Sequence, residues 1–336
     1  METKQEKVLV TGASGFIASH CISDLLKAGY NVKGSLRDIS KSDEIRVYFD
    51  KSDNDKLEFC QLDLLKDEGW VEATSDCEYI IHVASPFIIE EPKDENTLIK
   101  PALEGTLRAL NAASKSENIK KVVLTSSMAS IAYGHNRDIC NENDWTDISK
   151  DVGAYIKSKT ISEKAAWDYL SNKSSTSFAL CTIHPGMVFG PLLNKKSIGA
   201  SASLILNMIK GKYPALPDVF FTVVDVRDVS KLHVEALKNS KSNNKRIIAT
   251  SEKGISFLEI SNILRNLGFE KSPKNLIPNQ VINSLAPFNK EMRSTASMIK
   301  RGSYGTDIEE TKKIFKWNPL PLEQTLKDMT DSLQNI

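Results

Sequence analysis

The sequence of 336 residues predicts an α/β protein built on a doubly wound parallel sheet, followed by a smaller lobe. Two observations predict this class. Short runs rich in β-branched residues alternate with longer segments of helical spacing in the first half, and this rhythm changes after about residue 190. Strands separated by helices form βαβ units, which build a parallel sheet covered by helices on both faces.

The strands of the first half are predicted from short β-branched and apolar runs. They are expected at 7–11, 31–36, 57–62, 78–83, 121–127 and 178–184. The run 79–83 is almost continuously apolar, as in strands buried on both faces of a sheet. Between the first two strands, Ile17, Cys21 and Leu25 recur at helical spacing, which predicts a helix there.

The chain after about residue 190 is predicted to form the smaller lobe. Prolines interrupt this stretch at Pro191, Pro214 and Pro217. One further strand is expected at 246–251 and a final helix at 322–333, with a loop region rich in proline, asparagine and serine from about 271 to 306. We expect residues 1–190, joined by the strand near 246–251, to form one domain. Residues 191–336 would form mainly the lobe, over the carboxyl edge of the sheet where ligands bind.

Composition limits the function classes. The chain has 44 basic and 43 acidic residues, which argues against a general polyanion binder, so no nucleic-acid partner is expected. No apolar run approaches the roughly 20 residues of a membrane span. The polar residues 1–7 leave no room for a signal peptide. Five cysteines without a CxxC pair suit free thiols in the cytoplasm, and the dispersed histidines form no pattern of metal ligands.

A glycine turn follows the first predicted strand and opens a helix. Gly12 allows the tight turn, Gly15 lets the backbone approach a pyrophosphate, and Ala18 permits close packing of helix on strand. The helix N-terminus adds N–H donors and the positive end of a dipole. The alternative is a turn with a purely structural role, but its place between strand and helix favours a dinucleotide site. Residues 1–190 are therefore expected to form a Rossmann-type domain.

The choice of dinucleotide depends on the end of the second strand. An NAD enzyme usually places an acidic residue there for the ribose 2′-hydroxyl, and Leu36 occupies this position. Arg37 follows, and a guanidinium is a natural partner for a 2′-phosphate, with Lys41 as a second charge. The alternatives are that Arg37 is solvated in a loop or that Asp38 reaches the ribose. The sequence favours an NADP-binding domain that uses NADPH.

The residues suited to chemistry are a tyrosine, a lysine and a serine. Tyr155 and Lys159 lie one helical turn apart on the same face, and Ser127 ends the predicted strand 121–127. Hydride transfer to a carbonyl carbon leaves negative charge on the oxygen, which Ser127 would stabilise by a hydrogen bond and Tyr155 would protonate. Lys159 and an oxidised nicotinamide are expected to lower the pKa of Tyr155. Taken alone, Ser127 is better explained as a satisfied hydroxyl at a strand end.

Six motifs occur in the order and spacing of one enzyme family. They are Thr11-Gly12-x-x-Gly15-Phe16-Ile17, His82-Val83-Ala84-Ser85-Pro86-Phe87, Thr125-Ser126-Ser127, Tyr155-x-x-x-Lys159, and the segments 185–191 and 225–229. From about residue 7 to 333 the chain resembles the extended short-chain dehydrogenase/reductases. Its branch is that of dihydroflavonol 4-reductase, cinnamoyl-CoA reductase and the fungal and bacterial aldehyde or methylglyoxal reductases. The resemblance implies NADPH-dependent reduction of an aldehyde or ketone to an alcohol, by a monomer or homodimer.

The resemblance also implies the residues of the site. Ser127, rather than Ser126, becomes the catalytic serine beside Tyr155 and Lys159. Cofactor contacts are implied for Gly12, Ala13, Ser14, Gly15, Phe16, Ile17, Arg37, Lys41, Asp63, Leu64, Ala84, Ser85, Thr125, Tyr155, Lys159, Pro185, Gly186, Met187 and Val188. A small carbonyl substrate would lie against Phe87, Met128, Tyr133 and Phe189.

Two departures from the family pattern narrow these implications. Ala102 stands where many extended members carry an asparagine, so a proton relay through that asparagine is not expected. The residues after Ser127 do not resemble the polar set that binds flavonoids, so a flavonoid substrate is not expected either.

Two other functions remain open. A nucleotide-sugar epimerase or dehydratase uses the same scaffold, but a dehydratase would carry an Asp-Glu pair after Thr125, where Ser126 and Ser127 stand here. The second is a non-catalytic NADPH-sensing protein, and such proteins can lose the tyrosine–lysine pair that this chain keeps. Asp225, Arg227 and Asp228 are interpreted as an ion-pair network between the lobes, with substrate contact as the alternative.

Overall fold

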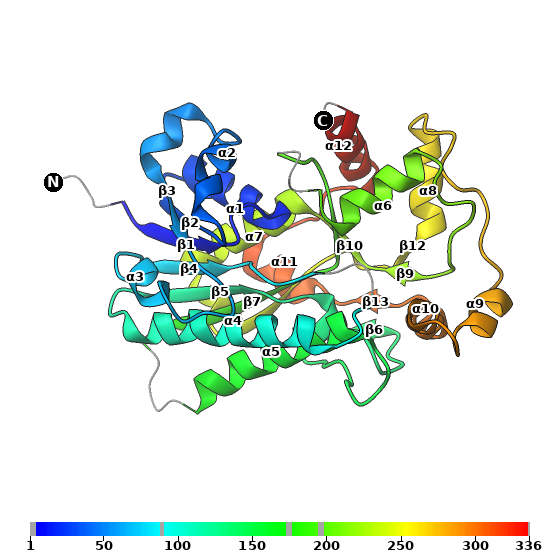
Figure 1. Cartoon of the computed structure of the whole chain (residues 1–336), viewed down its shortest axis with the longest axis horizontal. Coiled ribbons are helices and arrows are strands. Elements are labelled where there is room, and N and C mark those ends of the chain that lie inside the picture. The colour runs from blue at the N-terminus through cyan, green and yellow to red at the C-terminus, as the bar shows by residue number, and fades with distance from the viewer. Residues whose placement is uncertain (1–4, 88–90, 173–176, 194–197, 335–336) are drawn as a thin grey trace.

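The computed structural model describes residues 5–87, 91–172, 177–193 and 198–334. Among these residues, seven strands form a central sheet in which all neighbours run parallel (Figure 1). In spatial order they are β11 (Lys245–Ala249), β7 (Ala179–Pro185), β5 (Lys121–Thr125), β4 (Tyr79–His82), β1 (Lys7–Thr11), β2 (Asn31–Leu36) and β3 (Leu57–Gln61). Each corresponds to a predicted strand, and the ends agree to within two residues. The predicted fold class is confirmed.

Helices cover both faces of this sheet. Helices α1 (Phe16–Lys27) and α7 (Val226–Lys238) pack side by side on one face, and α4 (Asn96–Lys115) and α5 (Ala154–Ser171) on the other (Figure 1). Because neighbouring residues of a strand point to opposite faces, one strand serves both cores. In β1, Val8 and Val10 join the apolar core with α1 and α7, and Leu9 joins the core with α4.

The strand order reverses between β1 and β4. From β1 the chain continues to β2 and β3 on one side, whereas β4 is followed by β5, β7 and β11 on the other. In open α/β sheets a crevice forms outside the carboxyl ends of the strands at such a point. The glycine turn after β1 and the segment after β4 both begin there.

Most elements after residue 186 gather at this carboxyl edge (Figure 1). Strand β8 (Met187–Phe189) pairs with β10 (Val223–Asp225), and β9 (Phe220–Phe221) pairs with β12 (Ile255–Ser256). A separate apolar core lies among the helices α6 (Ala200–Ile209), α8 (Phe257–Asn266) and α12 (Leu322–Gln334). The predicted final helix is confirmed by α12, which ends one residue later than expected.

The prediction of a loop region from about 271 to 306 is wrong in part. The structure has two helices there, α9 (Asn279–Leu285) and α10 (Lys290–Arg301). The asparagines of α9 have low helix propensity, but tertiary contacts override propensity in short helices. The sequence of α10 is instead rich in lysine, arginine and methionine, which favour a helix. The Arg301 guanidinium donates to the carbonyls of Ala132 and Arg137, and Ile282 of α9 is buried.

Shorter elements connect these parts. They are α2 (Ser42–Arg46), α3 (Trp70–Thr74), α11 (Glu309–Phe315), the paired strands β6 (Ile139–Cys140) and β13 (Gly305–Thr306), and the 3-10 turns η1 (Ile39–Lys41), η2 (Lys51–Lys56), η3 (Met128–Ser130) and η5 (Ser240–Ser242). None of the described helices is long and apolar enough to cross a membrane.

Ion pairs join α7 to α12. Asp225 accepts the backbone N–H of Arg227, and the Arg227 guanidinium lies 2.7 Å from Asp225 and 2.7 Å from Asp328 of α12. Asp228 accepts the backbone N–H of Leu320 at 2.8 Å. These contacts link α7, which packs on the sheet, to α12 of the apolar core at the carboxyl edge, and all of them lie within residues 191–336.

Candidate active site

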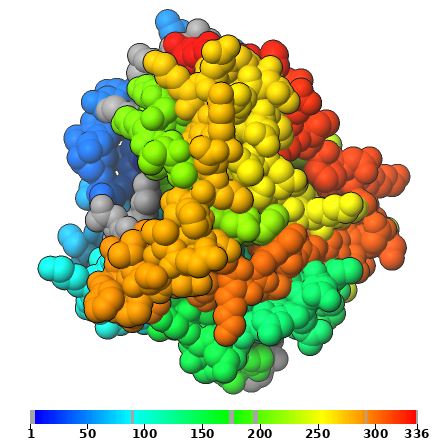
Figure 2. All heavy atoms as spheres, turned by 90° about the vertical axis from the view of Figure 1, so that its right-hand side faces the viewer, coloured from blue at the N-terminus to red at the C-terminus, as the bar shows by residue number. Residues whose placement is uncertain are grey.

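A cleft of about 1340 Å³ opens at the carboxyl edge of the sheet. Its described lining comes from the glycine turn after β1, from the ends of the neighbouring strands, and from α6 and α10 on the opposite side. Figure 2 faces this side of the molecule: a hollow separates the blue N-terminal residues from the yellow-green segment of α6. The orange segment with α9 and α10 lies across the same face.

The glycine turn is shaped by its backbone. Gly12 has φ +74°, a conformation that side chains rarely adopt, and a Cβ added there would lie 3.1 Å from the Cβ of Ala84. Its N–H donates to the Ser35 hydroxyl at 3.1 Å, and the Gly15 N–H donates to the Gly12 carbonyl at 2.8 Å. Gly15 is the N-cap residue of α1, and no side chain caps this helix. The N–H groups at the start of α1 are therefore available to an anion in the cleft.

The residues of this motif divide between the cleft and the core. Gly12, Ser14, Gly15, Phe16 and Ile17 line the cleft. Ala13 is fully buried, and a Cβ added at Gly34 would lie 2.9 Å from its methyl group. Ala13 thus contributes close packing of the turn on β2, and not side-chain surface to the cleft.

Of the two basic residues predicted to bind a 2′-phosphate near the end of β2, only one lines the cleft. Arg37 is exposed and lines the cleft. Lys41 lies outside the described lining, with 61% of its side chain exposed and its ammonium 4.0 Å from Asp38. The Asp38 carboxylate accepts the Ser40 hydroxyl at 2.6 Å and the Ser40 N–H at 3.1 Å, and these bonds lower the pKa of Asp38. Asp38 therefore caps η1, which disfavours the alternative that it reaches a ribose.

Four further predicted cofactor contacts follow the strands β3 and β4. Asp63 and Leu64, which follow β3, line the cleft, and so do Ala84 and Ser85. The Thr11 hydroxyl accepts the N–H of Ala84 at 3.0 Å and so fixes this segment beside the glycine turn. The Ser85 hydroxyl oxygen is buried without a hydrogen-bond partner. Because buried polar groups are normally hydrogen-bonded, this oxygen fits a contact with a polar ligand.

The three catalytic candidates come from two elements. Ser127 follows β5 and caps η3, where its hydroxyl accepts the Ala129 N–H at 3.1 Å. Tyr155 lies in the first turn of α5 and lines the cleft with Ser127. Lys159 is one turn further along α5, buried behind the cleft, and its ammonium donates to the Thr125 carbonyl at 3.2 Å. The structure therefore brings Ser127, Tyr155 and Lys159 together.

The pKa of Tyr155 moves against the expectation from sequence. Burial raises the pKa of the phenol, and the neighbouring Ser127 hydroxyl only partly opposes this. Burial also lowers the pKa of Lys159 to about 8, against the attraction of Glu163. Among the protein groups described, burial of the ring therefore outweighs the lowering of the pKa that was expected from Lys159 together with an oxidised nicotinamide. A phenol with a raised pKa keeps its proton near neutral pH, as a proton donor must.

Three of the four predicted substrate residues line the cleft. These are Phe87, Met128 and Tyr133, and the Phe87 ring meets Tyr155 edge to face with ring centroids 4.9 Å apart. Phe189 does not line it: the side chain is fully buried in the apolar core with α6, α8 and α12. Met187 and Phe189 lie on the same face of β8, because side chains alternate along a strand. Met187 is at the rim of this core and also lines the cleft, whereas Phe189 lies in the interior of the core.

Of the remaining predicted cofactor contacts, four line the cleft and one does not. Pro185, Gly186, Met187 and Val188 line the cleft. Thr125 lies outside the described lining, and its hydroxyl is 2.8 Å from Nε2 of His233. Its contribution is the carbonyl that binds Lys159.

Sequence reasoning missed most of the cleft wall opposite the sheet. The missed lining residues include Asn207, Tyr213, Phe221, Thr222, Phe257, Met298 and Tyr304. They come from six separate segments, and no motif or spacing connects them. Only Arg37 and Asp63 are charged among the described lining residues, and both lie in the sheet-side half. No group of three or more metal-ligating side chains occurs in the described ranges.

Comparison with known proteins agrees with this geometry. A model of the 3-beta hydroxysteroid dehydrogenase/isomerase family matches residues 9–255. A cinnamoyl-CoA reductase of Medicago truncatula is 35% identical over 269 residues, spanning 77% of this chain and 80% of the relative. An NADPH-dependent methylglyoxal reductase of Saccharomyces cerevisiae is 31% identical over 279 residues, spanning 76% of this chain and 81% of the relative.

A solved structure extends the likeness to the whole fold. The crystal structure of yeast methylglyoxal/isovaleraldehyde reductase complexed with NADPH superposes with a TM-score of 0.80, at 28% identity and with 98% of both chains covered. The resemblance inferred from the six motifs is thereby confirmed. This chain belongs to the 3-beta hydroxysteroid dehydrogenase/isomerase family, within the extended short-chain dehydrogenase/reductases.

Proposed function

We propose that this protein is an NADPH-dependent reductase that converts an aldehyde or ketone to an alcohol, with Tyr155 as the proton donor. The observation that carries the proposal is the meeting of Ser127 and Tyr155 in one cleft, with Lys159 buried behind them and the glycine turn beside them. The named relatives, a methylglyoxal reductase and a cinnamoyl-CoA reductase, both reduce carbonyl groups by name. One hydride and one proton add across the C=O bond.

The residues of the sheet-side half fit NADPH. The start of α1 and the glycines would hold the pyrophosphate, and Arg37 the 2′-phosphate. The unpartnered Ser85 hydroxyl would meet the nicotinamide half, and so would the segment 185–188. At Gly186, an added Cβ would lie 2.2 Å from the Thr222 carbonyl, so this segment packs tightly at its position. When bound, NADPH supplies the hydride.

Side chains of the protein stabilise the negative charge that develops on the carbonyl oxygen. As negative charge builds on the carbonyl oxygen, the Ser127 hydroxyl donates a hydrogen bond to it. Tyr155 then transfers its phenolic proton to this oxygen. The Lys159 ammonium, anchored on the Thr125 carbonyl, stabilises the phenolate left behind.

The cleft favours a small neutral carbonyl compound over a nucleotide sugar. The described lining opposite the sheet is apolar and aromatic, with hydroxyl and amide groups but no charged side chain for a second diphosphate. The intact Ser127, Tyr155 and Lys159 set disfavours a sensor without turnover. We also propose that residues 1–190 mainly bind NADPH and residues 191–336 mainly bind substrate, in a cytoplasmic monomer or homodimer. The five free cysteines suit that compartment.

The test is consumption of NADPH with a panel of small aldehydes, α-dicarbonyls and aryl ketones, run in parallel with NADH and with a Tyr155→Phe variant. Turnover that prefers NADPH and collapses in the variant is the expected result. Tight NADPH binding with no turnover on any compound would favour the sensor instead.

A further inference from the structure

A buried carboxylate lies behind the catalytic residues and takes no direct part in the proposed reaction. Glu163 is on α5, one turn after Lys159 and two turns after Tyr155, so all three share one helix face. It is fully buried. Taking a carboxylate out of water costs several kcal/mol unless its oxygens are well satisfied. The partners of Glu163 therefore indicate what this residue does.

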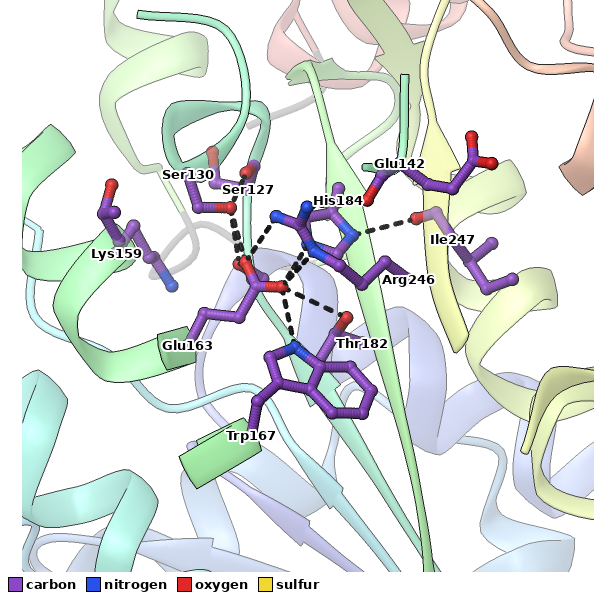
Figure 3. A network of polar contacts seen from close by, with 12 residues as sticks. Ser127, Ser130, Glu142, Lys159, Glu163, Trp167, Thr182, His184, Arg246 and Ile247 are labelled. Carbon is purple, nitrogen blue, oxygen red and sulfur yellow. Dashed lines mark hydrogen bonds and ion pairs between the residues drawn. The ribbon is translucent and has the colours of Figure 1, made fainter. Parts of the chain in front are cut away.

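The two carboxylate oxygens of Glu163 contact different sets of side chains, and only Arg246 contacts both (Figure 3). Oε1 accepts the Trp167 indole N–H at 3.1 Å and the Thr182 hydroxyl at 3.4 Å, and it contacts Nε2 of His184 at 2.8 Å and Nε of Arg246 at 2.7 Å. Oε2 accepts the hydroxyls of Ser126 at 2.6 Å and Ser130 at 2.5 Å, with Arg246 Nη2 at 3.3 Å.

The two serines on Oε2 flank the catalytic serine in the chain. Ser126 directly precedes Ser127, and Ser130 closes the turn η3 that Ser127 caps. The Ser130 hydroxyl also lies 2.8 Å from the Ser127 backbone carbonyl. One carboxylate oxygen thus holds both ends of the short segment that presents Ser127, and it does so from the helix that presents Tyr155 and Lys159.

The charge on Glu163 is maintained by its basic neighbours. Burial alone would raise the pKa of this carboxyl, but His184 and the Arg246 guanidinium outweigh that effect and hold the pKa well below its usual range. Arg246 is itself fixed, because it donates to the Glu142 and Asp144 carbonyls at 2.7 Å each. A carboxylate that stays ionised accepts hydrogen bonds on both oxygens, and charge-assisted bonds are the stronger kind.

We propose that Glu163 is a positioning residue of the reductase. Through its hydrogen bonds with Ser126 and Ser130 it fixes the position of Ser127 relative to Tyr155 and Lys159. The inference rests on the proposed function and adds a part to it. Glu163 does not touch the cleft, since it is absent from its described lining. Its effect on the reaction passes through the position of the Ser127 hydroxyl.

The test removes the two hydroxyls and leaves the carboxylate in place. In the full chain, a Ser126→Ala/Ser130→Ala double variant is made in the natural background and in a Ser127→Ala background. Thr182→Val is the matched control, because it removes a hydroxyl from the same carboxylate on the side away from Ser127. The measurements are kcat and KM with a small aldehyde, Kd for NADPH, and thermal unfolding. The slow rates of the Ser127→Ala background are measured in single-turnover reactions with excess enzyme.

The double variant is expected to lose about tenfold or more in kcat, because misplaced donors in such sites cost on this scale. Kd for NADPH should stay within about twofold, and so should kcat of Thr182→Val. In the Ser127→Ala background the same double change should cost less than about twofold, since no hydroxyl is left to position.

Three results would overturn the role of Glu163. They are an unchanged kcat in the double variant, an equal loss in both backgrounds, and a loss shared by Thr182→Val. If the double variant does not fold, Ser130→Ala alone is subject to the same comparison between backgrounds. Turnover by the unaltered protein is measured first: its absence would contradict the proposed function, whereas normal turnover with unaffected variants contradicts only the positioning role.

Discussion

The two walls of the cleft are built in different ways. The sheet-side wall consists of strand ends and the turns that follow them, and its shape depends on local backbone geometry such as the positive φ of Gly12. The opposite wall is assembled from α6, α10 and single residues of distant segments, such as Phe257 and Tyr304. The first wall can be recognised from a short motif, and the second exists only once the chain has packed.

This difference implies that the two walls should respond differently to substitution. Changes in the sheet-side wall should act on NADPH binding and on the chemical step for every substrate. Changes in the opposite wall should alter the ranking of substrates and leave NADPH binding intact. Four predictions test this contrast, in order of decreasing effect.

Gly12→Ala should weaken NADPH binding by about a hundredfold. The left-handed backbone costs an L-residue about 1–2 kcal/mol, and the new methyl group would press on Ala84 beside the turn. Kd is measured by titration of cofactor fluorescence. Gly29→Ala is the matched control, because Gly29 has φ +85° at the end of α1 with no atom within 4 Å of an added Cβ. It should lose stability without losing affinity, and an equal loss of affinity in both variants would refute the local role of Gly12.

Arg37→Ala should weaken NADPH binding about ten- to a hundredfold and leave NADH binding almost unchanged. A guanidinium–phosphate contact is charge-assisted, and such bonds contribute about 1.5–3 kcal/mol. Lys41→Ala should have a smaller effect, because Lys41 lies outside the described lining. Kd for both cofactors at one ionic strength separates the two residues. A larger loss in Lys41→Ala would show that the 2′-phosphate lies further along η1.

The rate of reduction should fall about tenfold per pH unit at alkaline pH, beginning near pH 8. The pKa of Lys159 is lowered to about 8 by burial, so its ammonium is lost as the pH rises through that value. The titratable groups facing Lys159 are His82 of β4 and Tyr155 and Glu163 of α5. His82 is neutral in this range, because burial lowers its pKa to about 3. A kcat profile that stays flat to pH 10, with NADPH saturating throughout, would rule out a role for this ammonium.

Met298→Ala should change the ratio of kcat/KM between a bulky and a small aldehyde about threefold or more, because it enlarges the wall formed by α10. Kd for NADPH should not change. Met292→Ala on the same helix is the matched control, since Met292 is not among the described lining residues. If Met298→Ala altered NADPH binding instead, the division between the two walls would be wrong.

The sequence predicted the parts that depend on local chemistry. Gly12, Arg37, Tyr155 and Lys159 could be placed because a turn, a strand end and a helical spacing each fix a residue relative to a known edge of the sheet. Helix α9 was missed because its asparagines have low helix propensity and packing decides its structure. Helix α10 was missed although its lysines, arginines and methionines favour a helix, because the prolines, asparagines and serines around it gave the whole stretch the composition of a loop. Phe189 was misplaced because its depth depends on how α6, α8 and α12 pack around it, which no local pattern specifies.

Glu163 shows a further limit of prediction from sequence. Its spacing from Lys159 was visible, but its partners Ser126, Ser130 and Arg246 come from segments that only the fold brings together. Nothing local distinguishes it from the solvated glutamates of other helices.

Transfer of deuterium tests the central claim most directly. NADPH carrying deuterium at the reactive carbon of the nicotinamide, prepared in both configurations, is incubated with the protein and a small aldehyde, and the alcohol is analysed by mass spectrometry and NMR. Our account predicts that one configuration delivers deuterium to the carbinol carbon, and that Tyr155→Phe binds NADPH normally but forms almost no alcohol. NADPH consumption without deuterium in the alcohol, or an equal rate in Tyr155→Phe, would contradict hydride transfer with Tyr155 as the proton donor.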